Sequence, residues 1–148
     1  MGVKHILFVC TGNTCRSPLA EALLRERMGD KVEVKSAGVH AFPGSKASEG
    51  TSRVLLDKGI DHDHTSQPVT NDLLEWADVV LTMTAGHKQL VCSQFMEHTE
   101  KVHTLKEYAG QNAHTTDIAD PFGGSIEEYV RTADDIEECL DELEKKLK

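Results

Sequence analysis

A cysteine and an arginine near the start of the sequence have a spacing that suits phosphate chemistry. Cys10 and Arg16 enclose the five residues Thr-Gly-Asn-Thr-Cys, and Ser17 and Pro18 follow directly. A short loop of backbone N–H groups closed by a two-pronged guanidinium fits a tetrahedral oxyanion such as phosphate. The same positive surroundings favour the thiolate of a cysteine, which is its nucleophilic form. We therefore predict that Cys10 attacks phosphorus and forms a phosphocysteine intermediate, with Arg16 as the phosphate clamp.

The residues between and behind these two can support that chemistry. Gly12 lets the backbone approach a ligand closely, and Asn13 tolerates the left-handed backbone conformation that holds a tight loop in shape. The Ser17 hydroxyl can donate to the sulfur of Cys10 and make it a better leaving group in the second step. The predicted substrate-binding residues of the loop are Thr11, Gly12, Asn13, Thr14, Cys15 and Ser17. The alternative is a buried structural cysteine after a strand, with the arginine on a solvated helix turn.

The flanking segments predict a strand and a helix on either side of this loop. Residues 6–9 (Ile-Leu-Phe-Val) indicate a buried strand, and residues 19–28 indicate a helix with Ser17 as N-cap and Pro18 at its first position. This order places the loop N–H groups and the positive end of the helix around one point. That point is an anion site.

Strands and helices alternate along the rest of the chain. Apolar residues at a spacing of three to four from Ile126 to Leu147 give the last helix one buried face. Four strands separated by helices predict an α/β fold with a parallel sheet and ligands at the carboxyl ends of the strands, in a single domain over residues 1–148. The further strands are expected at residues 32–39, 79–83 and 101–105. One helix is expected at residues 45–58 with Ser45 as its N-cap, and a short one follows Thr70 as N-cap. Two more helices are expected, one at residues 86–96 and one that starts at the capping box Ser125 to Glu128.

An aspartate in a long loop supplies the acid that this chemistry needs. Attack on phosphorus expels a leaving group that must take up a proton. Within the expected loop Lys106 to Gly124, Asp120 is the strongest candidate, because Pro121 stiffens its position and two glycines give a mobile flank. Asp117 is its rival, three residues upstream and without a proline. The alternative to a catalytic role is an ordinary Asp-Pro-x-Gly turn.

Charge and cysteine usage exclude several classes of partner. The 148 residues carry a formal net charge of −9 without a basic block, which argues against nucleic acid, and no apolar stretch is long enough to span a membrane. The first residues run into a strand, so we expect no signal peptide. Cysteines at positions 10, 15, 92 and 139 form neither a zinc knuckle nor a disulfide framework, which favours reduced thiols in a cytoplasm. Cys15 is either a partner of Cys10 in a reversible disulfide or a small packing residue.

The segment Asp61-His62-Asp63-His64 resembles a metal-binding cluster. Alternating residues of this kind in a polar loop are, however, typical of solvated side chains. We therefore predict no metal and no cofactor.

The sequence resembles the low-molecular-weight protein tyrosine phosphatase family over essentially its whole length. The motifs that carry the resemblance are the loop from Cys10 to Ser17, Ser36-Ala37-Gly38 after the second strand, and Asp120-Pro121. The resemblance implies a flavodoxin-like three-layer fold with a four-stranded parallel sheet, and it implies Cys10 as nucleophile, Arg16 as clamp and Asp120 as general acid. It also implies that Asn13, Ser17 and Ser36 support the loop and that Phe42 and Phe122 form aromatic walls.

Within that family the sequence is most similar to the bacterial protein arginine phosphatases. They share Thr-Gly-Asn-Thr-Cys-Arg-Ser, here residues 11–17, and Asp-Pro-Phe-Gly-Gly-Ser, here residues 120–125. Tyrosine-directed members usually have an aliphatic residue in place of Thr14 and tyrosines after the Asp-Pro. A phosphorylated guanidinium has N–H groups that need acceptors, and the Thr14 hydroxyl and the Asp120 carboxylate can provide them.

We therefore predict a protein arginine phosphatase that acts as a monomer on arginine-phosphorylated proteins. The alternative within the family is a tyrosine phosphatase. An arsenate reductase of the same fold is disfavoured because it needs a downstream cysteine pair, and only Cys92 lies in that region. A phosphate-binding or redox-sensing module without turnover is disfavoured because both Cys10 and Asp120 are present.

Overall fold

Four parallel strands form the sheet that positions the Cys10 loop. In the computed structural model, which describes residues 2–110 and 116–147, the strands lie in the order β2-β1-β3-β4. All neighbouring strands are parallel, so their carboxyl ends lie at one edge of the sheet, where open α/β sheets bind ligands. The predicted flavodoxin-like α/β fold is confirmed. The strand bounds are β1 His5–Cys10, β2 Glu33–Gly38, β3 Val79–Thr82 and β4 Val102–Thr104.

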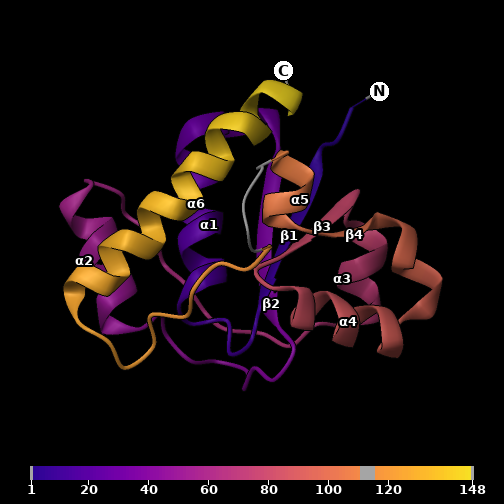
Figure 1. Ribbon diagram of the computed structural model, residues 1–148, viewed down its shortest axis with the longest axis horizontal. Coiled ribbons are helices and arrows are strands. Elements are labelled where there is room, and N and C mark those ends of the chain that lie inside the picture. The colour runs from indigo at the N-terminus through magenta and orange to yellow at the C-terminus, as the bar shows by residue number, and fades with distance from the viewer. Residues whose placement is uncertain (1, 111–115, 148) are drawn as a thin grey trace.

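Helices cover both faces of the sheet because consecutive residues of the central strand are apolar, so that each face presents apolar side chains. Ile6 and Phe8 of β1 belong to a core cluster with α1, α2, α5 and α6, whereas Leu7 and Val9 belong to a second cluster with α3 and α4. Figure 1 shows α1 and α6 on one side of the strands and α3 and α4 on the other. The helix bounds are α1 Arg16–Met28, α2 Glu49–Asp57, α3 Asn71–Trp76, α4 Ala85–Gln94, α5 Leu105–Ala109 and α6 Ile126–Leu147.

The last helix largely follows the predicted apolar pattern. Among its buried residues are Tyr129, Ala133, Ile136, Leu140 and Leu143. Ile126 and Val130 were expected on the same face, but they are exposed, although Tyr129 between them is buried. The N–H of Glu128 donates to the Ser125 hydroxyl at 3.4 Å, as the capping box predicts.

Two of the predicted helix starts are wrong. Helix α1 begins at Arg16 after Cys15, and no side chain caps it, because the Ser17 hydroxyl contacts Cys10 and Asn13 instead. Helix α2 begins at Glu49, capped by Ser48, because the backbone N–H of Ser45 donates to the Ser66 hydroxyl. In both cases a tertiary hydrogen bond overrides the local capping preference.

The segment expected as a loop from Lys106 to Gly124 starts with a helix. Helix α5 is held at its start by a capping box between Thr104 and Glu107 and ends at Gly110 in the left-handed conformation. Residues 111–115, which belong to the same expected loop, lie outside the described residues. The irregular part that carries Asp120 is described from residue 116 onward.

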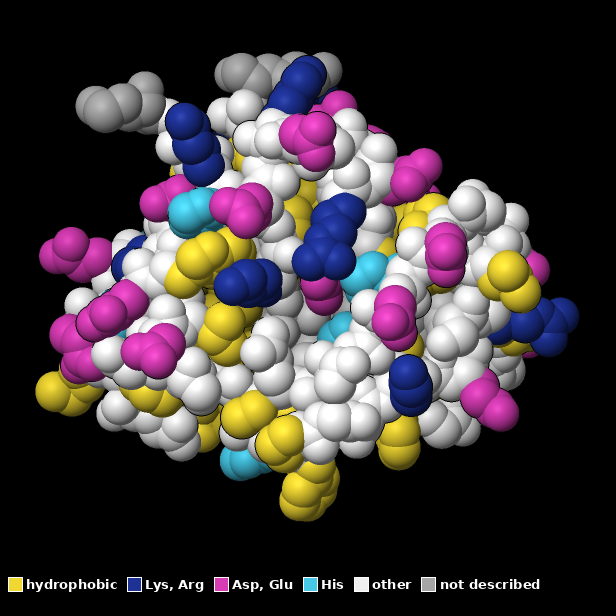
Figure 2. All heavy atoms as spheres, turned by 180° about the vertical axis from the view of Figure 1, so that it is seen from behind, with side chains coloured by type: hydrophobic (Ala, Val, Ile, Leu, Met, Phe, Trp, Pro, Cys, Tyr) yellow, Lys and Arg dark blue, Asp and Glu magenta, His cyan; other side chains and the backbone are white. Residues whose placement is uncertain are grey.

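The surface mixes charges of both signs. Figure 2 shows acidic and basic side chains interspersed over the face turned away from Figure 1, without a continuous basic area among the described residues of that face. Of the helices in the described parts of the chain, none has the length and apolar content that crossing a membrane requires.

Candidate active site

The loop from Thr11 to Cys15 has its carbonyl groups bonded elsewhere and its amides unused. The carbonyls of Thr11 and Thr14 accept hydrogen bonds from the N–H groups of His40 and Ser48, both at 2.9 Å. The amides of residues 12–15 donate to no described residue. Since these amides precede the first turn of α1, they form a set of donors for an anion at the helix start.

The Cys10 thiol lies at the carboxyl end of β1 and is almost fully buried. Its Sγ atom is 2.9 Å from the Ser17 hydroxyl oxygen. Asn13 Nδ2 donates to the same hydroxyl at 2.8 Å. With its oxygen accepting from Asn13, the Ser17 hydroxyl can direct its proton at the sulfur, which stabilises a thiolate.

Asn13 supports the loop from the interior of the protein. It has a φ of 58°, the left-handed conformation that asparagine tolerates, and it is completely buried. Its Nδ2 also donates to the Ser36 hydroxyl at 2.9 Å, and its Oδ1 accepts the backbone N–H of Gln67 at 2.9 Å. The Ser36 hydroxyl in turn donates to Glu21 Oε1 at 2.5 Å. This buried network fixes the shape of the loop.

Arg16, a residue that is only 5% exposed, closes the loop with its guanidinium. Nη1 donates to the carbonyl of Ile118 at 2.9 Å, and Nη2 donates to Thr11 Oγ1 at 3.4 Å. The N–H of Ile118 donates to the Met83 carbonyl at 2.7 Å, which ties the aspartate-bearing segment to the end of β3. Arg16 Nε is buried without a hydrogen-bond partner among the described residues, so it remains a donor for a phosphate oxygen.

Of the two candidate acids, Asp120 faces the guanidinium. Its Oδ2 lies 3.5 Å from Arg16 Nη2, and its Oδ1 accepts the N–H of Phe122 at 3.0 Å. Asp117 Oδ1 instead accepts the N–H of Ala85 at 2.8 Å at the start of α4. The structure therefore brings Asp120 to the loop and uses Asp117 at a helix start.

A pocket of about 210 Å³ unites most of the predicted site residues. A Cβ atom at Gly12 would meet only Thr14 Oγ1, at 3.8 Å, so a side chain there would fill the pocket rather than collide with the loop. Asn13, Ser17 and Ser36 are buried under the loop, and Phe42 is 82% exposed outside the lining. The lining residues are Cys10, Thr11, Gly12, Thr14, Cys15, Arg16, Asp120 and Phe122.

Sequence reasoning missed His87 in α4. Its Nε2 lies 2.8 Å from Thr11 Oγ1, the hydroxyl that Arg16 also contacts. Burial and the nearby charge of Arg16 lower the pKa of His87 to about 4, so it is neutral at physiological pH. Its only sequence signal is a position just after the expected third strand, whose carboxyl end adjoins that of β1.

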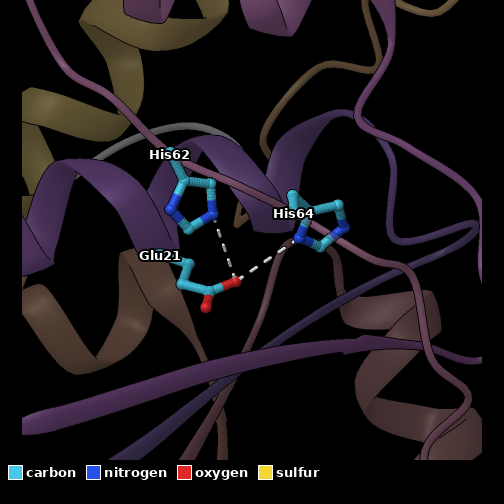
Figure 3. Close-up of side chains that lie close together, drawn as sticks. All are labelled: Glu21, His62 and His64. Carbon is cyan, nitrogen blue, oxygen red and sulfur yellow. Dashed lines mark ion pairs between the residues drawn. The ribbon is translucent and has the colours of Figure 1, made fainter.

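The interpretation of His62 and His64 as solvated is wrong. Their side chains are only 6% and 3% exposed, although the neighbouring Asp61 and Asp63 are exposed. Both imidazoles turn toward the carboxylate of Glu21 on α1, as Figure 3 shows. His64 Nε2 also donates to the carbonyl of Asn13 at 2.6 Å, so this cluster touches the Cys10 loop from below.

Comparison with known proteins defines the class to which this fold and site belong. The family described as "Low molecular weight phosphotyrosine protein phosphatase" matches residues 5–148. The chain belongs to this family.

Relatives of high similarity are protein arginine phosphatases. The chain is 52% identical to "Protein-arginine-phosphatase" of Bacillus subtilis (strain 168), over 97% of this chain and 96% of the relative. It superimposes with a TM-score of 0.92 on a structure titled "YwlE arginine phosphatase from Geobacillus stearothermophilus", at 48% identity over 97% of this chain and 92% of the other. A YwlE cysteine-to-serine mutant with a phosphorylated active-site serine has a TM-score of 0.90 at 51% identity, over 97% and 95% of the two chains.

Proposed function

We propose that this protein is a protein arginine phosphatase that hydrolyses phosphoarginine in proteins through a phosphocysteine intermediate. The observation that carries the proposal is the pocket in which the Cys10 thiol, the Arg16 guanidinium and the Asp120 carboxylate converge. The relatives named above support the choice of substrate, and the relative with a phosphorylated active-site serine supports an intermediate on the residue at position 10.

The first step transfers the phosphoryl group to sulfur. The Cys10 thiolate attacks phosphorus in line with the departing guanidine nitrogen, and the P–N bond breaks as the P–S bond forms. The loop amides and Arg16 take up the charge that spreads over the three equatorial oxygens. Asp120, in its protonated form, gives its proton to the nitrogen that leaves.

The second step returns the free enzyme. Asp120, now a carboxylate, takes a proton from a water molecule that attacks the phosphocysteine, and inorganic phosphate forms as the P–S bond breaks. Cys10 leaves as a thiolate that the Ser17 hydroxyl stabilises at 2.9 Å. Asn13, Ser36 and His87 position the loop without touching the reacting atoms.

Thr14 favours phosphoarginine over phosphotyrosine in this proposal. Its side chain lines the pocket together with Asp120 and Phe122. The substrate guanidinium brings N–H donors into the pocket, and leaving them without acceptors costs about 1–3 kcal/mol per buried group. The Thr14 hydroxyl accepts one of them, whereas an aliphatic side chain at this position suits a phenol ring.

The decisive experiment compares phosphoarginine and phosphotyrosine peptides of the same sequence as substrates for the wild type and Thr14→Ile. We expect the wild type to prefer phosphoarginine, and we expect kcat/KM for phosphoarginine in the variant to fall by roughly 10- to 100-fold relative to phosphotyrosine. Thr14→Ser retains the hydroxyl and is the matched control, with an unchanged preference.

A wild type that prefers phosphotyrosine would make this protein a tyrosine phosphatase. Cys10→Ser should abolish phosphate release from either peptide. If that variant still turned over, the nucleophile would be another residue and the proposed mechanism would be wrong.

The proposal extends to the redox state and the setting of the enzyme. Cys15 lines the same pocket as Cys10, and a peroxide can oxidise the two thiols to a disulfide while it is itself reduced to water. We expect peroxide-treated wild type to regain activity with a thiol reductant and Cys15→Ala to regain less, because its nucleophile oxidises further. Equal recovery would leave Cys15 as a packing residue. The four free thiols fit a reducing cytoplasm, and we propose that the protein acts there as a monomer.

A further inference from the structure

Three side chains outside the Cys10 pocket converge on one point. Glu21 Oε1 lies 3.8 Å from His62 Nε2 and 3.7 Å from His64 Nδ1. The ligand atoms that the three residues offer all lie within 4.8 Å of one another, and Figure 3 shows both imidazoles turned to the same carboxylate oxygen. We propose that Glu21, His62 and His64 form a binding site for a divalent transition-metal ion, with Zn²⁺ as the ion that tests it.

The donor set has the composition that zinc prefers. Two imidazole nitrogens and one carboxylate oxygen are the protein ligands of many zinc sites that keep a fourth position open. Zinc bonds of about 2.0–2.2 Å in a tetrahedron place the ligand atoms about 3.3 Å apart. The separations of 3.7 and 3.8 Å between Glu21 Oε1 and the two imidazole nitrogens are close to that value, and all three ligand atoms lie within 4.8 Å of one another, so the side chains must move inward to coordinate an ion.

A buried imidazole nitrogen without a hydrogen bond is a second, independent indication of a ligand. His62 Nε2 is buried and has no hydrogen-bond partner among the described residues, and its side chain is only 6% exposed. A buried polar atom without a partner is costly to the fold. A metal ion between His62 and Glu21 would supply the missing partner.

The surroundings orient the ligands as metal sites require. His64 donates its Nε2 proton to the carbonyl of Asn13 at 2.6 Å, which leaves the lone pair of Nδ1 on the side of Glu21. A metal-bound histidine commonly donates its other N–H to a carbonyl in this way. The carboxylate is held by the Ser36 hydroxyl at Oε1 and by Arg25 Nη2, 2.7 Å from Oε2.

Access and charge determine how tightly an ion binds. A surface pocket of about 300 Å³ reaches Glu21 and His64, and its other charged lining residues are Arg25, Lys35 and Asp63. Arg25 and Lys35 repel a metal ion more than Asp63 attracts it, because Arg25 pairs with the Glu21 carboxylate at 2.7 Å, so the site is weaker than a structural zinc site. Neutralising the nearer one, in Arg25→Gln, should therefore tighten zinc binding.

The first experiment measures Zn²⁺ binding to a Cys10→Ser/Cys15→Ser protein by titration calorimetry and thermal unfolding. The double substitution removes the pocket thiols, which are themselves soft ligands for zinc. We expect one Zn²⁺ ion per chain and a melting temperature that rises by several degrees at saturation, because the ion binds only the folded state. His62→Gln in the same background should weaken binding by at least about tenfold.

Two controls make the result specific. His103→Gln removes a partly buried histidine of β4 that contacts Tyr108 instead of this cluster, and it should bind Zn²⁺ as the parent does. Zn²⁺ should also shift the imidazole nitrogen NMR signals of His62 and His64 in the parent, a readout that requires no substitution of either histidine. Equal binding by the parent and a folded His62→Gln variant, or unshifted signals of both histidines, would overturn the proposal. Because Cys10 is absent throughout, neither result depends on the phosphatase activity.

Discussion

Asp120 is held toward Arg16 by contacts on both of its carboxylate oxygens. The guanidine of arginine is a poor leaving group, with a pKa above about 12, so its nitrogen must be protonated as it departs. We expect Asp120→Asn to reduce kcat for phosphoarginine by about 10²- to 10⁴-fold and to have a smaller effect on an aryl phosphate whose leaving group is a weak base. Kinetics on both substrates check this prediction.

Asp117→Asn is the matched control for that experiment. Its Oδ1 accepts the N–H of Ala85, and an asparagine oxygen can accept the same hydrogen bond. For Asp117→Asn we expect kcat to change little, and by the same factor for phosphoarginine and for the aryl phosphate. An equal loss for Asp120→Asn on good and poor leaving groups would show that Asp120 does not act as an acid.

At this scale the sequence identifies residues whose role depends on near neighbours in the chain. Cys10, Arg16 and Ser17 are close in sequence and lie in one loop, so type and spacing were enough to place them. His87 was missed because its contact with Thr11 depends on β1 and β3 being adjacent. His64 was misread because an imidazole in a polar segment gives no sign that it is buried against Glu21.

The junction between β2 and the Cys10 loop depends on a missing side chain. A Cβ atom on Gly38 would lie 2.5 Å from the Thr11 carbonyl oxygen and 2.9 Å from the Asn13 amide nitrogen. Gly38→Ala must therefore displace the loop, and we expect it to destabilise the fold by about 1–3 kcal/mol. Because a displacement of about 1 Å at a reaction centre costs roughly 100-fold in rate, we expect activity to fall at least that far. Urea unfolding and steady-state kinetics measure the two effects.

Gly86→Ala provides a comparison in which the same atom is added without a collision. The nearest atom to its Cβ is Thr84 Oγ1 at 3.5 Å, and alanine is favoured over glycine in a helix such as α4. We expect full activity and a stability that is equal or higher by up to about 1 kcal/mol. If Gly38→Ala behaved like Gly86→Ala, the close contact between β2 and the loop would not matter.

The elements themselves were predictable wherever a continuous apolar run or a clear period marked them. The apolar runs that start at Ile6 and Val79 predicted two of the strands, and the spacing of three to four between apolar residues predicted helix α6. The start of α2 was misplaced because Ser45 and Ser48 are equally good caps locally, and the hydrogen bond from Ser48 to the Thr14 carbonyl selects the second. Helix α5 was missed although Thr104 and Glu107 have capping-box spacing, because they directly follow a strand.

For the whole molecule, the burial of a neutral histidine links stability to pH. The pKa of His87 is about 4 in the folded protein, lowered by burial and then by Arg16, and about 6.5 in an unfolded chain. The unfolded state therefore binds more protons between these values, and the stabilisation that is complete above pH 6.5 is lost as the pH falls toward 4. The loss attributable to His87 is up to roughly 3 kcal/mol.

Urea unfolding at about pH 7 and about pH 5 tests this linkage. We expect the wild type to lose stability over this interval and His87→Gln to lose less, since glutamine does not titrate. The other groups with charge near His87 are Arg16, Asp117, Asp120 and His40. If the free energy of unfolding of His87→Gln fell with pH as steeply as that of the wild type, other groups in the protein would be responsible for the effect.

The bonds made by Ile118 have a consequence for how the enzyme meets its substrate. The amide of this residue is fastened to the sheet at Met83, and its carbonyl is fastened to Arg16. The segment that carries Asp120 is therefore linked both to the sheet and to Arg16 before any phosphoprotein binds. We expect vanadate to bind at the Cys10 loop while residues 117–121 stay almost where they are in the free protein, because catalysis then needs no movement of the segment that carries Asp120.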